Sequence, residues 1–253
     1  MTALAAVGVT KRYGDLTAVD EVSIEIRPEE TVALVGESGS GKSTLGRLLV
    51  GLEPPDGGAV TYAGAPIRGL KGPARRTFRR AVQIIFQDPY ASLNPRLTVG
   101  SAIREVLAVH EIAAGNAAAA KVSALLDRVG LDEGAARRYP HEFSGGQRQR
   151  IGIARALAVE PRILVADEPV SALDVSVQAR ILGLLSELRR DMGLGILFIS
   201  HDLAVVRRMA DRVAVMRAGR VVEVGPSKQV YANPGDPYTR ALLAAVPTLP
   251  KAT

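Results

Sequence analysis

A glycine-rich segment near the start of the chain has the residue types and spacing for the most specific chemistry in this sequence. It consists of Gly36, Glu37, Ser38, Gly39, Ser40, Gly41, Lys42, Ser43 and Thr44. The order matches the P-loop pattern G-x-x-x-x-G-K-[ST], in which glycines let the backbone curl so that N–H groups surround phosphate oxygens. In this pattern Lys42 reaches the β- and γ-phosphates, and the Ser43 hydroxyl holds Mg²⁺. The segment therefore predicts a site for a nucleotide's phosphates.

The residues on either side of this loop supply the local structure that such a site needs. Residues 31–35 are mostly β-branched and apolar, which is typical of a buried strand. Leu45, Leu48, Leu49 and Leu52 follow at helical spacing, and the positive end of a helix dipole favours bound phosphate. The alternative, a Gly/Ser linker that contains Gly-Lys-Ser by chance, does not explain the flanking strand and helix.

Two adjacent acids follow a second apolar run, at residues 163–167. Asp167 closes the run and would hold Mg²⁺ directly or through water, alongside Ser43. Glu168 is placed to orient or deprotonate the water that attacks the γ-phosphate. The alternative is an ordinary strand exit at which two acids reach solvent, and the glycine-rich segment favours the catalytic interpretation.

Gln87 and His201 follow two further apolar segments. The Gln87 amide can contact Mg²⁺ or the attacking water, and the imidazole of His201 can bond the γ-phosphate. Each also has a structural interpretation, as a polar cap on a strand end or a structural histidine. Because ligands bind at the carboxyl ends of strands in open α/β sheets, we expect these residues to meet the glycine-rich segment in one cleft.

Two other segments have chemistry that the sequence alone leaves open. Ser144, Gly145, Gly146 and Gln147 precede an amphipathic helix, and they are either a plain capped turn or a second phosphate-binding surface. Tyr13 is either a loop aromatic packed on a sheet or a platform for a planar ligand.

The order of predicted elements indicates an α/β fold with a mixed, largely parallel sheet, an N-terminal antiparallel β subdomain and an inserted α-helical subdomain. Strands are expected at residues 4–10, 18–26, 31–35, 59–62, 82–86, 163–167, 196–200, 212–217 and 220–224, and helices at about 98–109, 117–129, 146–158, 176–190 and 203–210. We expect one domain over residues 1–253. Its α/β core would span 1–88 and 159–225, its helical subdomain 89–158, with an exposed loop at 90–98, and its tail 226–253, with two short helical stretches.

Composition limits the class of protein. Of the 253 residues, 47% are hydrophobic, which supplies a sizeable core. No apolar run approaches the ~18 residues of a membrane span, no secretion signal is evident, and the absence of cysteine excludes disulfides and thiolate metal sites. The formal net charge of +6 is compatible with nucleic acid or an anionic membrane, but with 4% aromatic residues we favour a solvated basic surface. The same holds for the basic cluster at residues 75–80.

These motifs together resemble the nucleotide-binding subunit of an ATP-binding cassette (ABC) transporter. Residues 36–44 resemble its Walker A loop, Gln87 the Q-loop, residues 144–147 the signature, and residues 163–168 the Walker B strand with its glutamate. Tyr13 resembles the adenine-stacking aromatic, Asp174 belongs to a D-loop-like segment, and His201 resembles the switch histidine. Phe143 stands where many members have leucine.

The resemblance implies an ATPase with ATP and Mg²⁺ as its ligands and with Glu168, His201, Gln87 and Lys42 as catalytic residues. Ser43, Gln87 and Asp167 would serve the metal. Each ATP would lie between the Walker A loop of one subunit and the signature of a second, identical or paralogous subunit. The partners would be membrane permeases and, indirectly, an extracytoplasmic substrate-binding protein, with the chain peripheral on the cytoplasmic face of the membrane.

Residues 87–96, 141–147 and 233–240 resemble the oligopeptide, dipeptide and nickel importer branch, which implies peptides or a metal chelate as cargo. Many members of that branch bind an iron–sulfur centre through cysteines, which this chain lacks. A non-transport ABC ATPase acting on DNA or ribosomes is the alternative, although no coiled-coil insertion is evident. A regulatory cassette without turnover is a third possibility, which Glu168 and His201 argue against.

Overall fold

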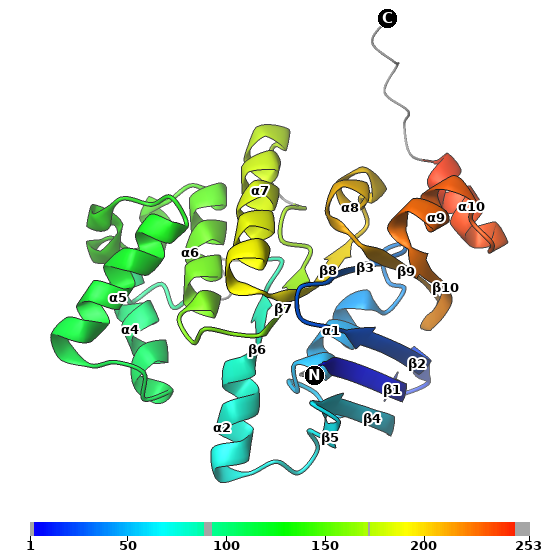
Figure 1. The fold of residues 1–253 in the computed structure, drawn as a ribbon, viewed down its shortest axis with the longest axis horizontal. Coiled ribbons are helices and arrows are strands. Elements are labelled where there is room, and N and C mark those ends of the chain that lie inside the picture. The colour runs from blue at the N-terminus through cyan, green and yellow to red at the C-terminus, as the bar shows by residue number, and fades with distance from the viewer. Residues whose placement is uncertain (1–2, 89–92, 172, 246–253) are drawn as a thin grey trace, which may run out of the picture.

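The computed structural model describes residues 3–88, 93–171 and 173–245, and within them two sheets are flanked by helices (Figure 1). The main sheet has six described strands in the order β10-β9-β3-β8-β7-β6. These are β3 (Thr31–Val35), β6 (Val82–Ile85), β7 (Ile163–Asp167), β8 (Gly195–Ser200), β9 (Arg212–Arg217) and β10 (Arg220–Pro226). Strands β9, β3, β8, β7 and β6 run parallel, and β10 is antiparallel to β9. The predicted mixed, largely parallel sheet is confirmed.

The second sheet is antiparallel and has the order β2-β1-β4-β5. Its strands are β1 (Leu4–Tyr13), β2 (Leu16–Ile26), β4 (Gly57–Tyr62) and β5 (Ala65–Pro66). Strands β1 and β2 extend beyond the predicted 4–10 and 18–26, because Tyr13 pairs with Leu16 across a tight turn in which Gly14 has a φ of 58°. Tyr13 is therefore the last residue of β1 and not a loop aromatic. Lys11 and Arg12 are charged, so the apolar pattern that indicates a strand ends before them, although β1 continues to Tyr13.

Helix α1 (Lys42–Leu49) lies between the two sheets. Leu45, Leu48 and Leu49 are fully buried in a core that also contains Val32 and Leu34 of β3 and the inward side chains of β1 and β2. The successive residues of β3 alternate between the two faces of the main sheet, as the pleat requires. The helix that follows the glycine-rich loop is thus held from both sides.

The opposite face of the main sheet is covered by α7 (Val175–Met192) and α8 (Leu203–Met209) (Figure 1). Their apolar residues join a second core with Ala33 and Val35 of β3. The tail forms α9 (Ser227–Ala232) and α10 (Pro237–Ala244) beside β10, which confirms the two short helical stretches. Residues 246–253 of the predicted tail lie outside the described residues.

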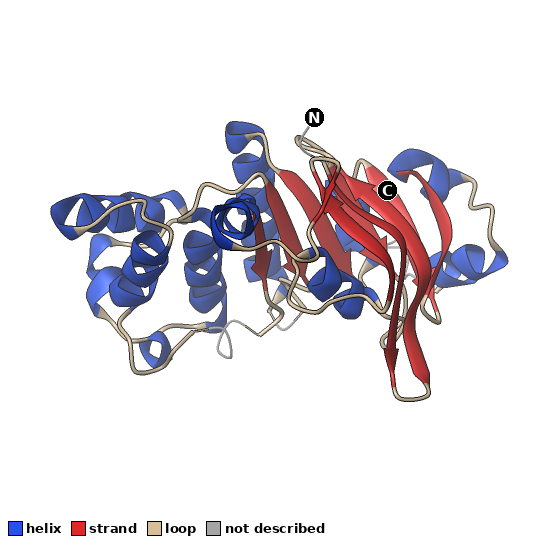
Figure 2. Cartoon of the chain, turned by 90° about the horizontal axis from the view of Figure 1, so that it is seen from below, coloured by secondary structure: helices blue, strands red, loops and turns tan. Residues whose placement is uncertain are grey.

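A group of helices is inserted between β6 and β7 and forms one end of the molecule (Figure 2). It contains α4 (Val99–Val109), α5 (Gly115–Arg128), the 3-10 turns η1 (Glu133–Arg137) and η2 (Pro140–Glu142), and α6 (Gly145–Leu157). Before it, α2 (Gly72–Ala81) leads into β6. The start of the expected loop at 90–98 lies outside the described residues. The proposed boundaries at 88 and 158 remain a prediction.

Candidate functional site

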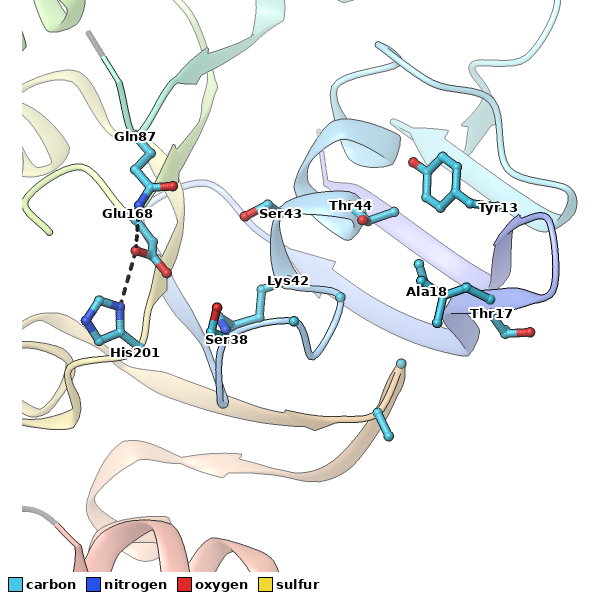
Figure 3. Close-up of a pocket in the computed structure, with 15 residues that line it drawn as sticks. Tyr13, Thr17, Ala18, Ser38, Lys42, Ser43, Thr44, Gln87, Glu168 and His201 are labelled. Carbon is cyan, nitrogen blue, oxygen red and sulfur yellow. Dashed lines mark hydrogen bonds and ion pairs between the residues drawn. The ribbon is translucent and has the colours of Figure 1, made fainter.

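A cavity of about 760 Å³ opens where the glycine-rich loop meets the carboxyl ends of the parallel strands (Figure 3). Its lining residues are Tyr13, Leu16, Thr17, Ala18, Ser38, Gly39, Gly41, Lys42, Ser43, Thr44, Gln87, Glu168, His201, Ala218 and Gly219. The loop follows β3, His201 follows β8, Glu168 follows β7 and Gln87 follows β6. Since these four strands are neighbours in that order, residues far apart in sequence face one cavity, as the sequence predicted.

The shape of the glycine-rich loop depends on glycine at both ends. Gly36 has a φ of 153°, and a Cβ there would lie 2.1 Å from the carbonyl oxygen of Met216. Gly41 has a φ of 102°, and a Cβ there would lie 2.1 Å from the carbonyl oxygen of Ala18. The loop therefore packs directly on backbone from both sheets, and no other residue fits at either position.

Lys42 is 4% exposed, and its ammonium group turns back onto the loop. Its Nζ donates to the carbonyl oxygens of Gly36 at 2.8 Å and Glu37 at 2.7 Å. Burial lowers the pKa of Lys42, while the nearby carboxylates of Glu168 and Asp167 oppose that shift. Its Nζ also lies 3.4 Å from Ser40 Oγ, so the ammonium is bonded to neutral oxygens and is well placed to bind anionic phosphate oxygens.

Ser43 and Asp167 form a pair of oxygen ligands. The Ser43 hydroxyl donates to Asp167 Oδ1 at 2.8 Å, and Asp167 is 5% exposed. Burial raises the pKa of Asp167, which the Ser43 hydrogen bond partly offsets. A hydroxyl and a carboxylate so close together suit Mg²⁺, a cation that prefers oxygen ligands and is commonly bound through one or two carboxylates and substrate phosphates.

Gln87 and His201 both contact the carboxylate of Glu168 (Figure 3). Gln87 Nε2 donates to Glu168 Oε2 at 3.1 Å, and His201 Nδ1 lies 3.2 Å from the same oxygen. The backbone of Glu168 has a φ of 46°, a strained conformation for a residue with a side chain. Backbone strain of this kind is frequent at functional sites. Here the strained residue is Glu168, whose carboxylate lies between Gln87 and His201 at the cavity wall.

Tyr13 forms the far end of the cavity, across the loop from Glu168 (Figure 3). The residue is 44% exposed, and its hydroxyl donates to Glu53 Oε2. This hydrogen bond is the largest of the effects that raise the pKa of Tyr13. The ring is thus fixed in orientation while a face remains accessible, which agrees with the interpretation of Tyr13 as a platform.

The segment Ser144–Gln147 lies at the start of α6, away from the residues that line the cavity. Ser144 Oγ accepts from the Gln147 N–H at 3.3 Å, and Gln147 Oε1 accepts from the Ser144 N–H at 3.0 Å. A Cβ on Gly146 would lie 2.3 Å from Val177 of α7, whose N-cap is Asp174. The capped turn is therefore present, and the role of this segment as a second phosphate-binding surface stays a prediction. Residue 172, in the D-loop-like segment, lies outside the described residues.

The sequence analysis missed five cavity residues: Leu16, Thr17, Ala18, Ala218 and Gly219. The turn between β9 and β10 brings two of them to the loop, since the Gly219 N–H donates to the Ser40 carbonyl at 3.0 Å. Residues of these types carry no specific chemical signal. The expected strands at 212–217 and 220–224 leave residues 218 and 219 between them, and this turn position could have indicated Ala218 and Gly219.

Comparison with known protein families identifies the family to which the chain belongs. The family model described as "ABC transporter" matches residues 19–171, more than half of the chain. The chain belongs to the ABC transporter family. The match includes the glycine-rich loop, Gln87, the Ser144 turn and the Asp167-Glu168 pair, and it confirms the resemblance inferred from these motifs.

Two curated relatives of this ABC chain carry the name glutathione import ATP-binding protein GsiA. The protein from Pectobacterium atrosepticum is 56% identical over 230 residues, which are 91% of this chain and 37% of the relative. The protein from Escherichia coli strain K12 is 56% identical over 233 residues, which are 92% of this chain and 37% of the relative. The chain therefore spans about 37% of the length of these curated relatives.

Solved ABC structures have the same fold. CbiO1 from Clostridium perfringens, described as part of the ABC transporter complex cbiONQ, superposes with a TM-score of 0.80 at 30% identity, covering 91% of this chain and 90% of that one. The ATP-binding cassette MJ0796, in a dimeric post-hydrolysis state with ADP and Pi, superposes with a TM-score of 0.79 at 30% identity, covering 88% and 98%. The fold is that of an ABC ATPase cassette. Among the described residues, no helix is long and apolar enough to cross a bilayer.

Proposed function

We propose that this chain binds and hydrolyses ATP at the cavity between the glycine-rich loop and the strand ends, and that the hydrolysis drives import across a membrane. The observation that carries the proposal is that Lys42, Ser43 and Glu168 line one cavity and that Ser43 is hydrogen-bonded to Asp167 directly behind it. These groups are a phosphate-binding cation, two oxygen ligands and a base. Together they match the requirements of phosphoryl transfer to water.

Each group has one role in this mechanism. The N–H groups of residues 38–44 surround the phosphates, and Lys42 exchanges its bonds to backbone carbonyls for bonds to the β- and γ-phosphate oxygens. Ser43 and Asp167 would hold Mg²⁺, which neutralises charge that develops on the phosphates. Glu168 accepts the proton of the attacking water, and Gln87 and His201 orient its carboxylate. Gln87 would also contact Mg²⁺ or the attacking water, and His201 the γ-phosphate.

The turn Ser144–Gln147, in which Ser144 is exposed and Gly146 is buried against α7, supports a site shared between two subunits. Since this turn lies outside the cavity of its own chain, we assign it to the γ-phosphate of an ATP bound by a second cassette, identical or paralogous. The solved structure of MJ0796, which has a similar fold, is a dimer bound to ADP and Pi. ATP would then join the two subunits, because only the closed pair satisfies the γ-phosphate charge from both sides.

The cargo is proposed from the relatives. GsiA is named for glutathione import, and glutathione is a peptide-like molecule, so we propose di- or oligopeptides or a related small peptide as cargo, with a metal chelate such as nickel as the second candidate. Permease subunits and an extracytoplasmic binding protein would complete the importer, and the chain would lie at the cytoplasmic face of the membrane.

A nucleic-acid ATPase is the alternative function, and its main support is the basic helix α2. In the structure Phe78 faces the core, while Arg76 pairs with Glu111 at 2.5 Å and Arg80 with Glu160 at 3.5 Å. A basic face that is partly neutralised by acidic residues of its own chain is a weaker phosphate-backbone site than its sequence suggests. We therefore retain the importer.

The test is Mg²⁺-dependent ATP hydrolysis by the purified full chain, alone and in vesicles with its permeases. We expect Lys42→Ala to lose ATP binding or hydrolysis and Lys121→Ala, which alters an exposed lysine paired with Glu160, to retain both. Unchanged turnover in Lys42→Ala contradicts the proposed site. Stimulation by a peptide-loaded binding protein supports the importer, and stimulation by DNA or ribosomes supports the alternative.

A further inference from the structure

The C-terminal segment contacts the glycine-rich loop through one side chain. Tyr238, in the first turn of α10, is 9% exposed, and its hydroxyl accepts a hydrogen bond from the Glu37 N–H at 3.2 Å. Some two hundred residues of sequence separate the two groups. None of the site motifs includes Tyr238, and the cavity lining does not include Glu37. The hydroxyl therefore contacts the loop from behind its phosphate-facing side.

Tyr238 is itself held firmly. Asp236 caps α10 by accepting from the Tyr238 N–H at 2.7 Å, and the guanidinium of Arg217 lies over the ring, 4.8 Å from its centroid. The N–H groups of Gly235 and Asp236 donate to the Glu223 carboxylate of β10 at 2.8 and 3.1 Å. The turn before α10 is thus bonded to the main sheet, and the hydroxyl is presented by a fixed support.

The same residue of the loop is bonded on both sides of its Cα atom. The Glu37 N–H donates to Tyr238, and the Glu37 carbonyl accepts from Lys42 Nζ at 2.7 Å. A nucleotide's phosphates compete for Lys42, so the carbonyl loses that bond when the lysine turns to the ligand. The Tyr238 hydroxyl then remains as the side-chain anchor of the Glu37 peptide.

We infer that Tyr238 is a positioning residue of the nucleotide site, through which the C-terminal segment 233–244 presets the glycine-rich loop for phosphate. The inference rests on the proposed function, because it assigns the effect to nucleotide binding. Its physical basis is that a loop already held in its binding conformation loses less conformational freedom when the ligand binds.

The chain offers a matched control in the same tail. Tyr231 of α9 also carries an arginine over its ring, Arg207 at 5.9 Å, and its hydroxyl also bonds a backbone group. That partner is the carbonyl of Leu203 at 2.6 Å, at the start of α8 and outside the glycine-rich loop. Tyr231→Phe and Tyr238→Phe therefore each remove one hydroxyl, and only the second acts on the loop.

The experiment compares these two variants of the full chain by amide hydrogen exchange without nucleotide and by the Kd for ATP. In Tyr238→Phe we expect the Glu37 amide to exchange about three- to tenfold faster and ATP to bind about threefold more weakly, the order of effect that loss of one hydrogen bond produces. In Tyr231→Phe both values should stay within about 1.5-fold of those of the unmodified chain, since the removed bond lies outside the loop.

Unchanged exchange at Glu37 in Tyr238→Phe overturns the inference, and so does an unchanged Kd for ATP or an equal effect of Tyr231→Phe. Failure of the unmodified chain to bind ATP is a different result, because it refutes the proposed function. The exchange measurement does not depend on nucleotide, so it still decides whether the tail hydroxyl holds the loop.

Discussion

The hydroxyl of Ser43 donates a hydrogen bond of 2.8 Å to Oδ1 of Asp167 and so joins the first turn of α1 to the carboxyl end of β7. The two residues are remote in sequence, and parallel strands bring them together. Both oxygen atoms are ligands that Mg²⁺ accepts, and burial of the carboxylate makes its charge expensive unless a cation or hydroxyl compensates it. We therefore propose the pair as the metal-holding group of the site.

Ser43→Ala should impair Mg²⁺ use more than nucleotide affinity. Without the hydroxyl the metal loses one ligand, while the loop N–H groups and Lys42 remain. We expect the Mg²⁺ concentration for half-maximal ATPase activity to rise about tenfold or more, as for other changes near a metal site. Measurement of ATPase activity against Mg²⁺ tests this. Ser43→Thr retains a hydroxyl and should stay close to the unmodified chain; an Mg²⁺ response in Ser43→Ala like that of the unmodified chain would remove Ser43 from the metal site.

Asp167→Asn should stabilise the nucleotide-free chain at neutral pH. Burial raises the folded-state pKa of Asp167, so ionisation costs the folded state more than the unfolded state. This cost is present above the folded pKa and vanishes below the unfolded pKa, where both states are protonated. We expect Tm to exceed that of the unmodified chain by about 2–4 °C at pH 7–8, the shift that roughly 1 kcal/mol gives at this size, with the difference shrinking toward pH 4. A Tm difference that grows as the pH falls would refute this.

Glu168→Gln should bind ATP and hydrolyse it very slowly. The amide keeps the size and contacts of the side chain but cannot accept the proton of the attacking water. We expect kcat to fall about a hundredfold or more, with ATP affinity retained and dimer accumulating in size-exclusion chromatography with ATP. Glu160→Gln, on an exposed glutamate that pairs with Lys121, is the control and should retain activity. A fully active Glu168→Gln chain would show that another group is the base.

Tyr13→Ala should weaken ATP binding because the adenine ring loses its stacking surface, while the contacts to the phosphates remain. Loss of a stacking surface costs roughly 1–3 kcal/mol per base, which is about five- to 150-fold in Kd. Tyr13→Phe keeps the ring, and Glu53→Ala keeps it but removes the acceptor of its hydroxyl, so both should have smaller effects. Titration with ATP and with inorganic triphosphate separates the contributions. Equal weakening for both ligands would place Tyr13 at the phosphates.

Two inactive variants should restore activity when mixed, provided that the partner cassette is a second copy of this chain. Lys42→Ala damages the glycine-rich loop, and Ser144→Arg damages the exposed turn. A mixed dimer contains one site with both defects and one site with neither. We expect each variant alone to have little ATPase activity and an equimolar mixture to regain up to about a quarter of the normal rate, since half of the dimers are mixed and each has one intact site.

The result of mixing also bears on the partner. No recovery, combined with normal recovery when a paralogous cassette is added, would indicate a heterodimer. No recovery with any cassette would contradict the shared site. Ser144 would then have only its structural role as the cap of α6.

The site could be predicted from the sequence where its chemistry is local. Residues 36–44 combine a loop pattern with the strand and helix that position it, and Asp167 and Glu168 directly follow a buried strand. Side-chain type and position along one segment were sufficient there. The same reasoning predicted the mixed sheet and the inserted helices, since alternation of strand and helix patterns is also a local property.

The rest depends on contacts that no local pattern specifies. The apolar residues of a single strand do not specify which strands lie beside it. The order β3, β8, β7, β6 nevertheless determines which side chains are neighbours at the site. Ala218 and Gly219 reach the cavity through a hydrogen bond to Ser40, and Tyr238 reaches Glu37 from the end of the chain. The extension of β1 to Tyr13 was missed because its exposed face is charged.

The leucines of α1 pack against the parallel strands on one side and against the antiparallel strands on the other, and Arg47 of this helix is exposed. A single enlarged or shortened side chain there would disturb both sheets at once, and with them the N–H groups that receive the phosphates. The stability of the fold and the binding of nucleotide therefore depend on the same contacts of the α1 leucines. For this molecule, warming that loosens the interior should abolish nucleotide affinity at the same temperature rather than leave a stable but inactive fold.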